Sequence, residues 1–334
     1  MLISYTGVIC INSLDLITLK EGYKLKNEKI IEIKEKKSEM LFPEDYDSKK
    51  EYYYKELEKY EDIGIINYWD DEYPDILRKI KDPPVIIYYK GDINLIKTHC
   101  VSVVGTRKPS EYGKNCCRDI VNMLKKFTVV SGLAYGIDLC AHENSEKTIA
   151  VLGCGVDIIY PAGNRKQYER IVKEGLVISE FFPGTKPTPY TFPYRNRIIA
   201  GLSETSIIIE AAKKSGSLIT ANYAATFGRE VLAVPGDINR KNSEGTNYLI
   251  FNGATPLISL EFLKNYFALD VFSQNYEMTE DEEIIYKMIK NNINSVDKIV
   301  FESGKPSYDI ITVLMNMQIK GIIKESEGTY YLTV

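Results

Sequence analysis

The pattern of apolar and polar residues changes its period near residue 100. Before that point, lysine and glutamate recur beside tyrosine and isoleucine at helical spacing, most clearly over residues 30–40 and 49–60, which predicts exposed amphipathic helices. Residues 70–92 then carry prolines around one short apolar run, residues 85–89, which predicts a strand. We therefore expect an α-rich N-terminal region over residues 1–68, followed by a connector that packs on the next domain.

From residue 101 onward, short apolar runs rich in β-branched residues recur between stretches with helical spacing. These runs cover residues 101–105, 127–132, 148–153, 176–180, 205–210 and 230–236. Most are continuously apolar, as in strands that are buried on both faces of a parallel sheet. Helical spacing over residues 112–124, 165–173 and 218–227 completes the alternation, which predicts a doubly wound α/β sheet over residues 69–270.

The last segment, residues 279–334, has the pattern of a separate small domain. Helical spacing over residues 279–291, 295–303 and 305–321 is followed by a hairpin pattern that turns near Gly328, which indicates a winged-helix domain. The polar face of its third helix carries Tyr308, Asp309, Asn316 and Gln318, with Lys320 only at the end. A DNA-reading helix needs cations against the phosphates, so we favour a protein partner or an autoinhibitory role for this domain.

Composition narrows the class of protein. The chain has 334 residues, of which 44% are hydrophobic and 26% charged, as in a globular protein of about two domains. No apolar run reaches the length of about 18 residues that spans a membrane, and the first residues lack the basic start of a secretory signal. The six cysteines form no CxxC pair and there are two histidines, so we expect no metal site and reduced thiols in the cytoplasm.

Charge is distributed unevenly along the chain. The formal net charge is -4, yet residues 101–250 hold 19 basic against 14 acidic side chains, and the segments on either side are acidic. A polyanion is therefore expected to dock on the middle of the chain, the alternative being ordinary scatter of surface charge.

Glycine or serine ends several of the predicted strands, and polar residues follow. The ends are Gly105-Thr106-Arg107, Ser131-Gly132, Gly153-Cys154-Gly155 and Ser179-Glu180. Glycine allows a backbone to approach a ligand closely, and the amides that open a helix attract anions. A single glycine of this kind can serve only in the turn that connects a strand to the following helix. Four such strand ends on one edge of a sheet, however, predict an anion-binding crevice at the carboxyl ends of the strands.

Two kinds of ligand chemistry find little support. The first turn reads GTRKPSEYG instead of GxGxxG, so a dinucleotide cofactor is not expected. No GxSxG nucleophile turn is present, and Asp138 is expected to anchor a helix. Glu180 and Glu210 could pair as acid and base, but we favour structural roles for both. We therefore assign no catalytic residue and no cofactor, and we expect a protein that is not an enzyme.

Single-stranded nucleic acid fits the crevice better. Such a site needs cations along the phosphates and an exposed ring on which a base stacks, worth about 1–3 kcal/mol per base. Cations are available at Arg107, Lys166, Arg195 and Arg197, and a ring at Phe192 or Tyr194. We expect one of Arg195 and Arg197 to be structural and the other to face the ligand, and Asn196 to cap the helix that starts there.

Seven segments together resemble the DprA (Smf) family of DNA-processing proteins over residues 70–263. They are VSVVGTRKPSEYG, VVSGLAYGID, TIAVLGCGVDIIYPAGN, FPYRNRIIAGLS, SGSLITA, GREVLAVPG and GTNYLI, in this order. The resemblance implies an extended Rossmann-like domain that binds single-stranded DNA, forms a homodimer and loads the RecA recombinase during natural transformation. It implies no reaction of its own.

The resemblance also implies particular site residues. The expected DNA-binding residues are Thr106, Arg107, Gly132, Gly153, Gly155, Lys166, Phe192, Arg195, Asn196, Arg197, Ser215, Gly216 and Ser217. Dimer contacts are expected around Tyr248, Ile250 and Leu257. Tyr135 stands where the family usually has an arginine, which removes one charge near the crevice. No GIG hairpin precedes Asp62, so we expect the N-terminal region not to touch DNA.

A nucleotide-binding or nucleotide-hydrolysing enzyme of the lysine-decarboxylase-like group is the alternative function. Those enzymes carry a PGGxGTxxE motif on a similar sheet. The nearest segment here, EAAKKSGSLITA, lacks the paired glycines and the glutamate spacing.

Overall fold

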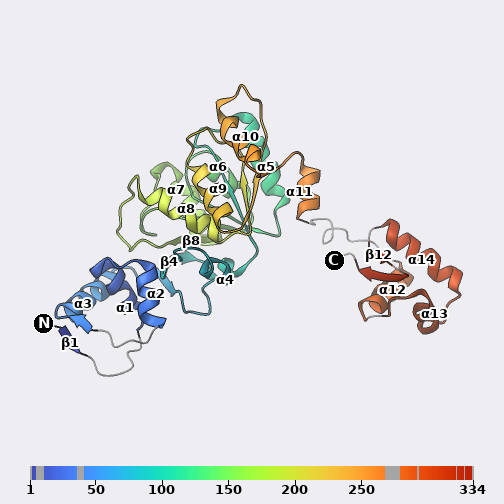
Figure 1. The fold of residues 1–334 in the computed structure, drawn as a ribbon, viewed down its shortest axis with the longest axis horizontal. Coiled ribbons are helices and arrows are strands. Elements are labelled where there is room, and N and C mark those ends of the chain that lie inside the picture. Colours follow the sequence, from blue (N-terminus) through green and yellow to red (C-terminus); the bar gives the residue numbers. More distant parts are fainter. Residues whose placement is uncertain are drawn as a thin grey trace. The chain divides into compact units, whose positions relative to one another are not determined.

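The computed structural model describes residues 2–4, 11–35, 41–267, 279–291, 293–320, 322–326 and 328–332. The chain divides into two compact units, residues 1–260 and residues 261–334 (Figure 1). Across the described ranges, no helix is both long enough and apolar enough to cross a membrane.

A single large sheet forms the centre of the first unit. In the part of the chain that the structure describes, it has nine strands in the order β11-β10-β9-β5-β6-β7-β8-β4-β3. In chain order these are β3 (Gly64–Asn67), β4 (Ile86–Gly91), β5 (Cys100–Val104), β6 (Thr128–Ser131), β7 (Thr148–Val151), β8 (Leu176–Ser179), β9 (Thr205–Ile208), β10 (Glu230–Ala233) and β11 (Thr255–Pro256). The strands from β11 to β8 are parallel, whereas β4 and β3 add antiparallel pairs at one edge. The predicted doubly wound, mostly parallel sheet is confirmed.

The direction of the chain reverses beside β5. From β5 the chain builds outward through β6, β7 and β8, and it then returns to place β9 on the other side of β5. Val101 accordingly faces Val129 of β6 on one side and Thr205 of β9 on the other. The gap between the ends of β5 and β9 is therefore the topological switch point, where ligands of such sheets bind.

Helices cover both faces of the sheet (Figure 1). They are α4 (Asp75–Arg78), α5 (Glu111–Met123), α6 (Ile137–Asn144), α7 (Arg165–Glu174), α8 (Thr191–Gly201), α9 (Ser217–Thr226) and α10 (Glu244–Phe251), with short turns η2 (Ile93–Lys97), η3 (Ala162–Asn164) and η4 (Lys241–Ser243). The three helices predicted between strands are confirmed as α5, α7 and α9. The helix predicted to start at Asn196 instead begins at Thr191, so Asn196 lies inside α8 and does not cap it.

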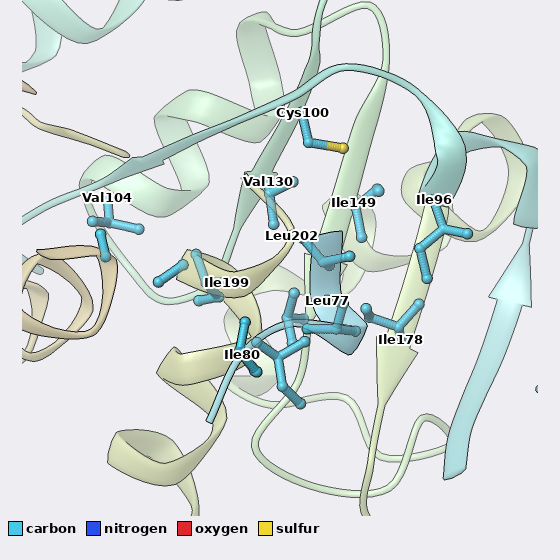
Figure 2. Close-up of a cluster of buried hydrophobic side chains, with 14 of the residues drawn as sticks. Leu77, Ile80, Ile96, Cys100, Val104, Val130, Ile149, Ile178, Ile199 and Leu202 are labelled. Atoms are coloured by element: carbon cyan, nitrogen blue, oxygen red, sulfur yellow. The ribbon is translucent and has the colours of Figure 1, made fainter. Parts of the chain in front are cut away.

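Two hydrophobic clusters lie on opposite faces of the sheet, because successive residues of a strand point to opposite sides. Ile149 and Val151 of β7 belong to one cluster, and Ala150 between them belongs to the other. Figure 2 shows the first cluster, in which Ile199 of α8 and Leu77 of α4 lie among side chains of the strands. This packing holds α8, which carries the FPYRN segment, firmly against the sheet.

The N-terminal region shares the second cluster with the sheet. It contains β1 (Leu2–Ser4), α1 (Ser13–Ile17), η1 (Thr18–Gly22), α2 (Asn27–Glu35), β2 (Leu41–Pro43) and α3 (Tyr46–Leu57). Leu16, Ile17 and Ile30 are fully buried and pack in the same cluster as Val85 and Tyr88. The two predicted amphipathic helices correspond to α2 and α3, although residues 36–40 of the first prediction lie outside the described residues.

The second unit is built around a small core of its own. Its described elements are the end of α11 (Leu260–Tyr266), α12 (Glu280–Lys290), α13 (Val296–Ser303), α14 (Ser307–Ile319), β12 (Ile323–Ser326) and β13 (Thr329–Leu332). Ile285, Ile299 and Leu314 are buried together between the three last helices and the hairpin. The predicted order of three helices and a hairpin is confirmed, and Gly328 lies in the turn with a φ of 75°.

Candidate nucleic-acid interface

A cleft of about 850 Å³ opens at the switch point, beyond the carboxyl ends of β5 and β9. Its walls include the predicted residues Thr106, Arg107, Phe192, Arg195, Asn196, Ser215, Gly216 and Ser217. Three separate segments supply these residues, and the sheet brings them together. The cleft wall does not include Gly132, Gly153, Gly155, Lys166 or Arg197.

Arg107 and Phe192 meet at the opening of this cleft. Arg107 is exposed in the loop after β5, and its guanidinium carbon lies 5.8 Å from the centre of the Phe192 ring. The ring of Tyr160 approaches Phe192 as well, with 5.3 Å between the ring centres. A cation beside two partly exposed rings is the combination that a phosphate and a stacked base require.

Arg195 forms part of the wall, but its guanidinium is held by the protein. The residue is 4% exposed, and its Nη1 donates to the carbonyl oxygens of Gly132, at 3.0 Å, and of Val151. Burial lowers the pKa of Arg195 to about 10, although the charge of Asp138 opposes this change. Arg195 therefore joins the ends of β6 and β7, and its positive charge remains beneath the cleft at neutral pH.

Asp138 completes this buried arrangement from the first turn of α6. Burial raises the pKa of its carboxyl group, and the charge of Arg195 and hydrogen bonds from the backbones of Ala134, Gly105 and Gly132 act against that rise. The expectation that Asp138 anchors its helix agrees with these contacts. The carboxylate binds the loops after β5 and β6 to one another.

The glycines at the strand ends shape the cleft from behind. A Cβ atom on Gly132 would lie 2.7 Å from Nη2 of Arg195, and one on Gly153 would lie 2.8 Å from Cδ1 of Phe192. A Cβ atom on Gly155 would lie 2.9 Å from the backbone nitrogen of Gly184 and 3.0 Å from the carbonyl oxygen of Phe182. Direct contact between these glycines and DNA was predicted, but the structure gives them a supporting role because side chains already pack over them.

Arg197 lies in the core and not in the cleft. Its exposure is 2%, and its Nη1 and Nη2 donate to the carboxylate of Glu180 at 2.5 Å and 2.7 Å. Its Nε donates to the backbone oxygen of Asp82 at 3.0 Å. Burial alone would lower the pKa of Arg197, but the charge of Glu180 outweighs it and raises the pKa. The assignment of Arg197 to DNA is therefore wrong, because these partners already surround its guanidinium.

The expectation for the arginine pair is thus corrected in part. Arg197 is the structural member, as one of the two was expected to be. Arg195 is also held by hydrogen bonds from Nη1 to backbone oxygens. It therefore contributes positive charge to the cleft wall, but this part of its guanidinium is not available to a ligand. Arg107 is left as the exposed arginine among the cleft-lining residues described here.

The SGS turn forms the opposite wall. Asn196 donates from Nδ2 to the carbonyl oxygen of Gly216 at 3.2 Å, which ties α8 to this turn. The hydroxyl oxygens of Ser215 and Ser217 lie 2.8 Å apart, and α9 begins at Ser217. The backbone nitrogens at the start of α9 donate within this turn: Ser217 to the hydroxyl of Ser215 at 3.4 Å, and Leu218 to its carbonyl oxygen at 3.2 Å.

Lysines that the sequence analysis did not single out also line the cleft. Lys108 and Lys241 belong to its wall, and Asn242 donates to the carbonyl oxygen of Lys108 at 2.9 Å. These are single lysines in loops that lie far apart in the sequence, so no spacing marks them. Lys166, which was expected in the site, is exposed at the first turn of α7 outside the cleft wall.

Glu210 and His142 are both engaged in structural bonds. The carboxylate of Glu210 accepts from the backbone nitrogen of Ser110 at 2.9 Å and from its hydroxyl at 2.5 Å. His142 is fully buried beside the hydroxyl of Thr148 at 2.7 Å, and burial lowers its pKa to about 3. Glu180 is held by Arg197. Neither Glu180 nor Glu210, which could have paired as acid and base, is therefore placed for that role in the cleft.

The residues expected at a dimer contact lie in different environments. Tyr248 on α10 is 59% exposed, whereas Ile250 is half-buried against the core. Leu257 is 6% exposed and belongs to the interior, so its assignment to an interface is corrected. Phe251, at 87% exposure, and Ile258 are the exposed apolar residues beside Tyr248 in the sequence.

The fold defines a Rossmann-like α/β protein with a cleft at its switch point that arginine and lysine residues help to line. The chain belongs to the DNA recombination-mediator protein A family, whose model matches residues 64–267. This confirms the family indicated by the sequence motifs.

Relatives and solved structures agree with this assignment. The DNA processing protein DprA of Streptococcus pneumoniae is 43% identical over 210 residues, which cover 61% of this chain and 73% of the relative. Protein Smf of Synechocystis is 34% identical over 310 residues, covering 78% of each chain. The X-ray structure of DprA from Streptococcus pneumoniae matches with a TM-score of 0.62 at 35% identity, covering 78% of this chain and 93% of that one. A structure on the single-stranded DNA binding mode of DprA from Helicobacter pylori matches with a TM-score of 0.58 at 32% identity, covering 62% and 96%.

Proposed function

We propose that this protein binds single-stranded DNA in the cleft between the ends of β5 and β9, and that it does so without catalysing a reaction. The pairing of exposed Arg107 with the ring of Phe192 carries this proposal. The similar protein from Helicobacter pylori has a described mode of single-stranded DNA binding, which supports the same ligand here.

The shape of the site favours a single strand over a duplex. A base can stack on Phe192 only if its face is free, and in a duplex both faces are covered by neighbouring base pairs. Arg107 beside the ring is placed for the adjoining phosphate. Because rings and phosphates are common to all nucleotides, we expect little dependence on base sequence.

The charges around the cleft favour a polyanion. Arg107, Lys108 and Lys241 line it, and the buried charge of Arg195 lies beneath. Binding through such contacts releases counterions from the DNA, so the affinity falls steeply as salt increases.

A direct test compares strands of equal length. Fluorescence anisotropy of a labelled oligo-dT, titrated with the full chain, should show binding that an unlabelled single strand competes away and a duplex does not. Equal competition by duplex, or no binding of the single strand at low salt, would argue against the proposal.

We further propose that the bound strand is handed to RecA in the cytoplasm and that the protein acts as a homodimer during natural transformation. The recombination-mediator family supports this role. The exposed apolar side chains of Tyr248, Phe251 and Ile258 support a contact between two copies at this end of the sheet. A measurement of RecA filament growth on strands covered by single-strand binding protein, with and without this chain, tests the hand-over.

For the second unit we propose a protein partner. Residues 261–334 contain seven lysines, no arginine and twelve acidic residues. Along α14, Tyr308, Ile311 and Met315 are exposed at helical spacing, so its outer face is apolar where a DNA reader would be basic. Removal of residues 279–334 should therefore leave the affinity for single-stranded DNA unchanged; a marked loss of affinity would contradict this.

A further inference from the structure

Two cysteine side chains face one another between α5 and α6. The Sγ atom of Cys117 lies 3.7 Å from the carbonyl oxygen of Ile137, one turn before Cys140. The Sγ atom of Cys140 lies 3.8 Å from the carbonyl oxygen of Lys114, one turn before Cys117. Each sulfur thus reaches across to the helix that carries the other.

The two thiols differ in exposure and in acidity. Cys117 is fully buried, whereas Cys140 is half-buried and reachable from solvent. The neighbouring Cys117 lowers the pKa of Cys140 more than burial raises it, and Nδ2 of Asn144 donates to the sulfur of Cys140 at 3.6 Å. Because the thiolate is the reactive form of cysteine, Cys140 is the nucleophile of the pair.

We propose that Cys117 and Cys140 form an oxidation site, which a peroxide converts to an intramolecular disulfide between α5 and α6. The Cys140 thiolate attacks one peroxide oxygen and the O–O bond breaks, which gives a sulfenic acid and a hydroxide ion; the hydroxide takes up the proton that the thiol had released and becomes water. The sulfur of Cys117 then attacks the sulfur of Cys140, the S–O bond breaks, and the S–S bond forms with loss of a second water. The two thiols together give up two electrons, and the peroxide is reduced to two molecules of water.

The position of this pair connects it to the cleft. The helices α5 and α6 follow the loops that carry Arg107 and Gly132, and the backbone nitrogen of Ile137 donates to the carbonyl oxygen of Thr106 at 3.2 Å. A disulfide would lock these two helices together two residues beyond Asp138, which anchors the strand ends. The inference itself does not depend on the ligand that the cleft binds.

The native full-length protein tests this inference directly. After treatment with hydrogen peroxide and alkylation of the remaining thiols, mass spectrometry of tryptic peptides should find Cys117 linked to Cys140, with the loss of two hydrogens and of two titratable thiols. A dithiol reductant should restore both. Wild-type protein in which Cys140 stops at a sulfenic or sulfinic acid, or in which no linked peptide forms, would overturn the proposal.

Neighbouring Cys116 provides the matched control. It is half-buried on the same helix, one residue before Cys117. The Cys116→Ser variant should form the disulfide as the wild type does, and Cys140→Ser, which changes a half-exposed position, should not form it. A linkage that persists in Cys140→Ser, or that disappears in Cys116→Ser while the circular dichroism is unchanged, would refute the assignment to Cys117 and Cys140.

Discussion

The ring of Phe192 packs over Gly153, so closely that a Cβ atom on the glycine would lie 2.8 Å from Cδ1 of the ring. The glycine lies two residues after β7 and the ring belongs to α8, so two segments far apart in the sequence jointly set the direction of the ring. Because Arg107 lies on the same ring, the orientation of Phe192 also determines where a phosphate and a base can sit together.

Gly153→Ala should therefore weaken binding of single-stranded DNA by displacing the ring. Phe192→Ala removes the stacking surface outright and should cost about 1–3 kcal/mol, or about 5- to 150-fold in affinity. In the double variant, Gly153→Ala should add little to the loss caused by Phe192→Ala, since both act through the same ring. Anisotropy titrations of the four proteins measure this; additive losses would show that the glycine acts in another way.

Stacking can be separated from phosphate binding with an abasic strand. Phe192→Ala should lose affinity for oligo-dT but bind an abasic oligonucleotide of equal length as the wild type does. Arg107→Ala should weaken binding of both strands, because it removes a phosphate contact. If Phe192→Ala were equally defective on both strands, the ring would not be the stacking surface.

The Arg197–Glu180 pair should matter for stability and not for DNA. Removal of Arg197 leaves the buried carboxylate of Glu180 with the longer contact to Lys20 at 3.5 Å, so Arg197→Met should lower the free energy of unfolding by about 3–5 kcal/mol. The double variant Arg197→Met with Glu180→Met should recover much of the loss. Urea denaturation measures both, and the folded Arg197→Met protein should keep its affinity for oligo-dT; a selective loss of binding would restore Arg197 to the site.

Acid should weaken the same pair. Burial would raise the pKa of Glu180, but the charges of Arg197 and Lys20 outweigh it and lower the pKa below the ordinary value of 4.5. A carboxyl group with a depressed pKa contributes stability above its unfolded pKa and loses it as the pH falls toward the folded value. Stability should therefore drop more steeply below pH 4.5 in the wild type than in Glu180→Gln, as followed by urea midpoints.

His142 should make stability depend on pH in a higher range. Burial lowers its pKa from 6.5 to about 3, so below pH 6.5 the unfolded chain binds a proton that the folded chain does not. The contribution of neutral His142 to the free energy of unfolding is therefore fully present above pH 6.5. Below that pH, the free energy of unfolding falls by about 1.4 kcal/mol per pH unit. Between pH 6.5 and pH 5, before carboxylates titrate, this slope should be present in the wild type and absent in His142→Gln.

The proposed dimer contact predicts a change in size. Phe251→Glu places a charge in an exposed apolar position on α10 and should convert a dimer to a monomer in light scattering at micromolar concentration. Tyr52→Glu, an exposed tyrosine on α3, should leave the dimer intact. A wild-type protein that is already monomeric would contradict the homodimer itself.

The sheet was predictable because its signal is local. Continuous β-branched runs mark β5 to β10, and each run requires burial wherever it is placed. The site was only partly predictable, because its geometry depends on distant partners. Arg195 and Arg197 are two residues apart on one helix, and Glu180, Gly132 and Val151 determine how each is held. The lining lysines Lys108 and Lys241 meet only after the sheet has formed.

The most direct test of the central claim is the salt dependence of oligo-dT binding in the wild type, in Arg107→Ala and in Arg118→Ala. Arg118 is an exposed arginine on α5 outside the cleft wall and serves as the matched control. We predict that wild type and Arg118→Ala share a steep loss of affinity with increasing salt, and that Arg107→Ala binds more weakly with a shallower slope. Equal affinity and slope for all three proteins would contradict the claim that the strand is bound at the β5–β9 cleft.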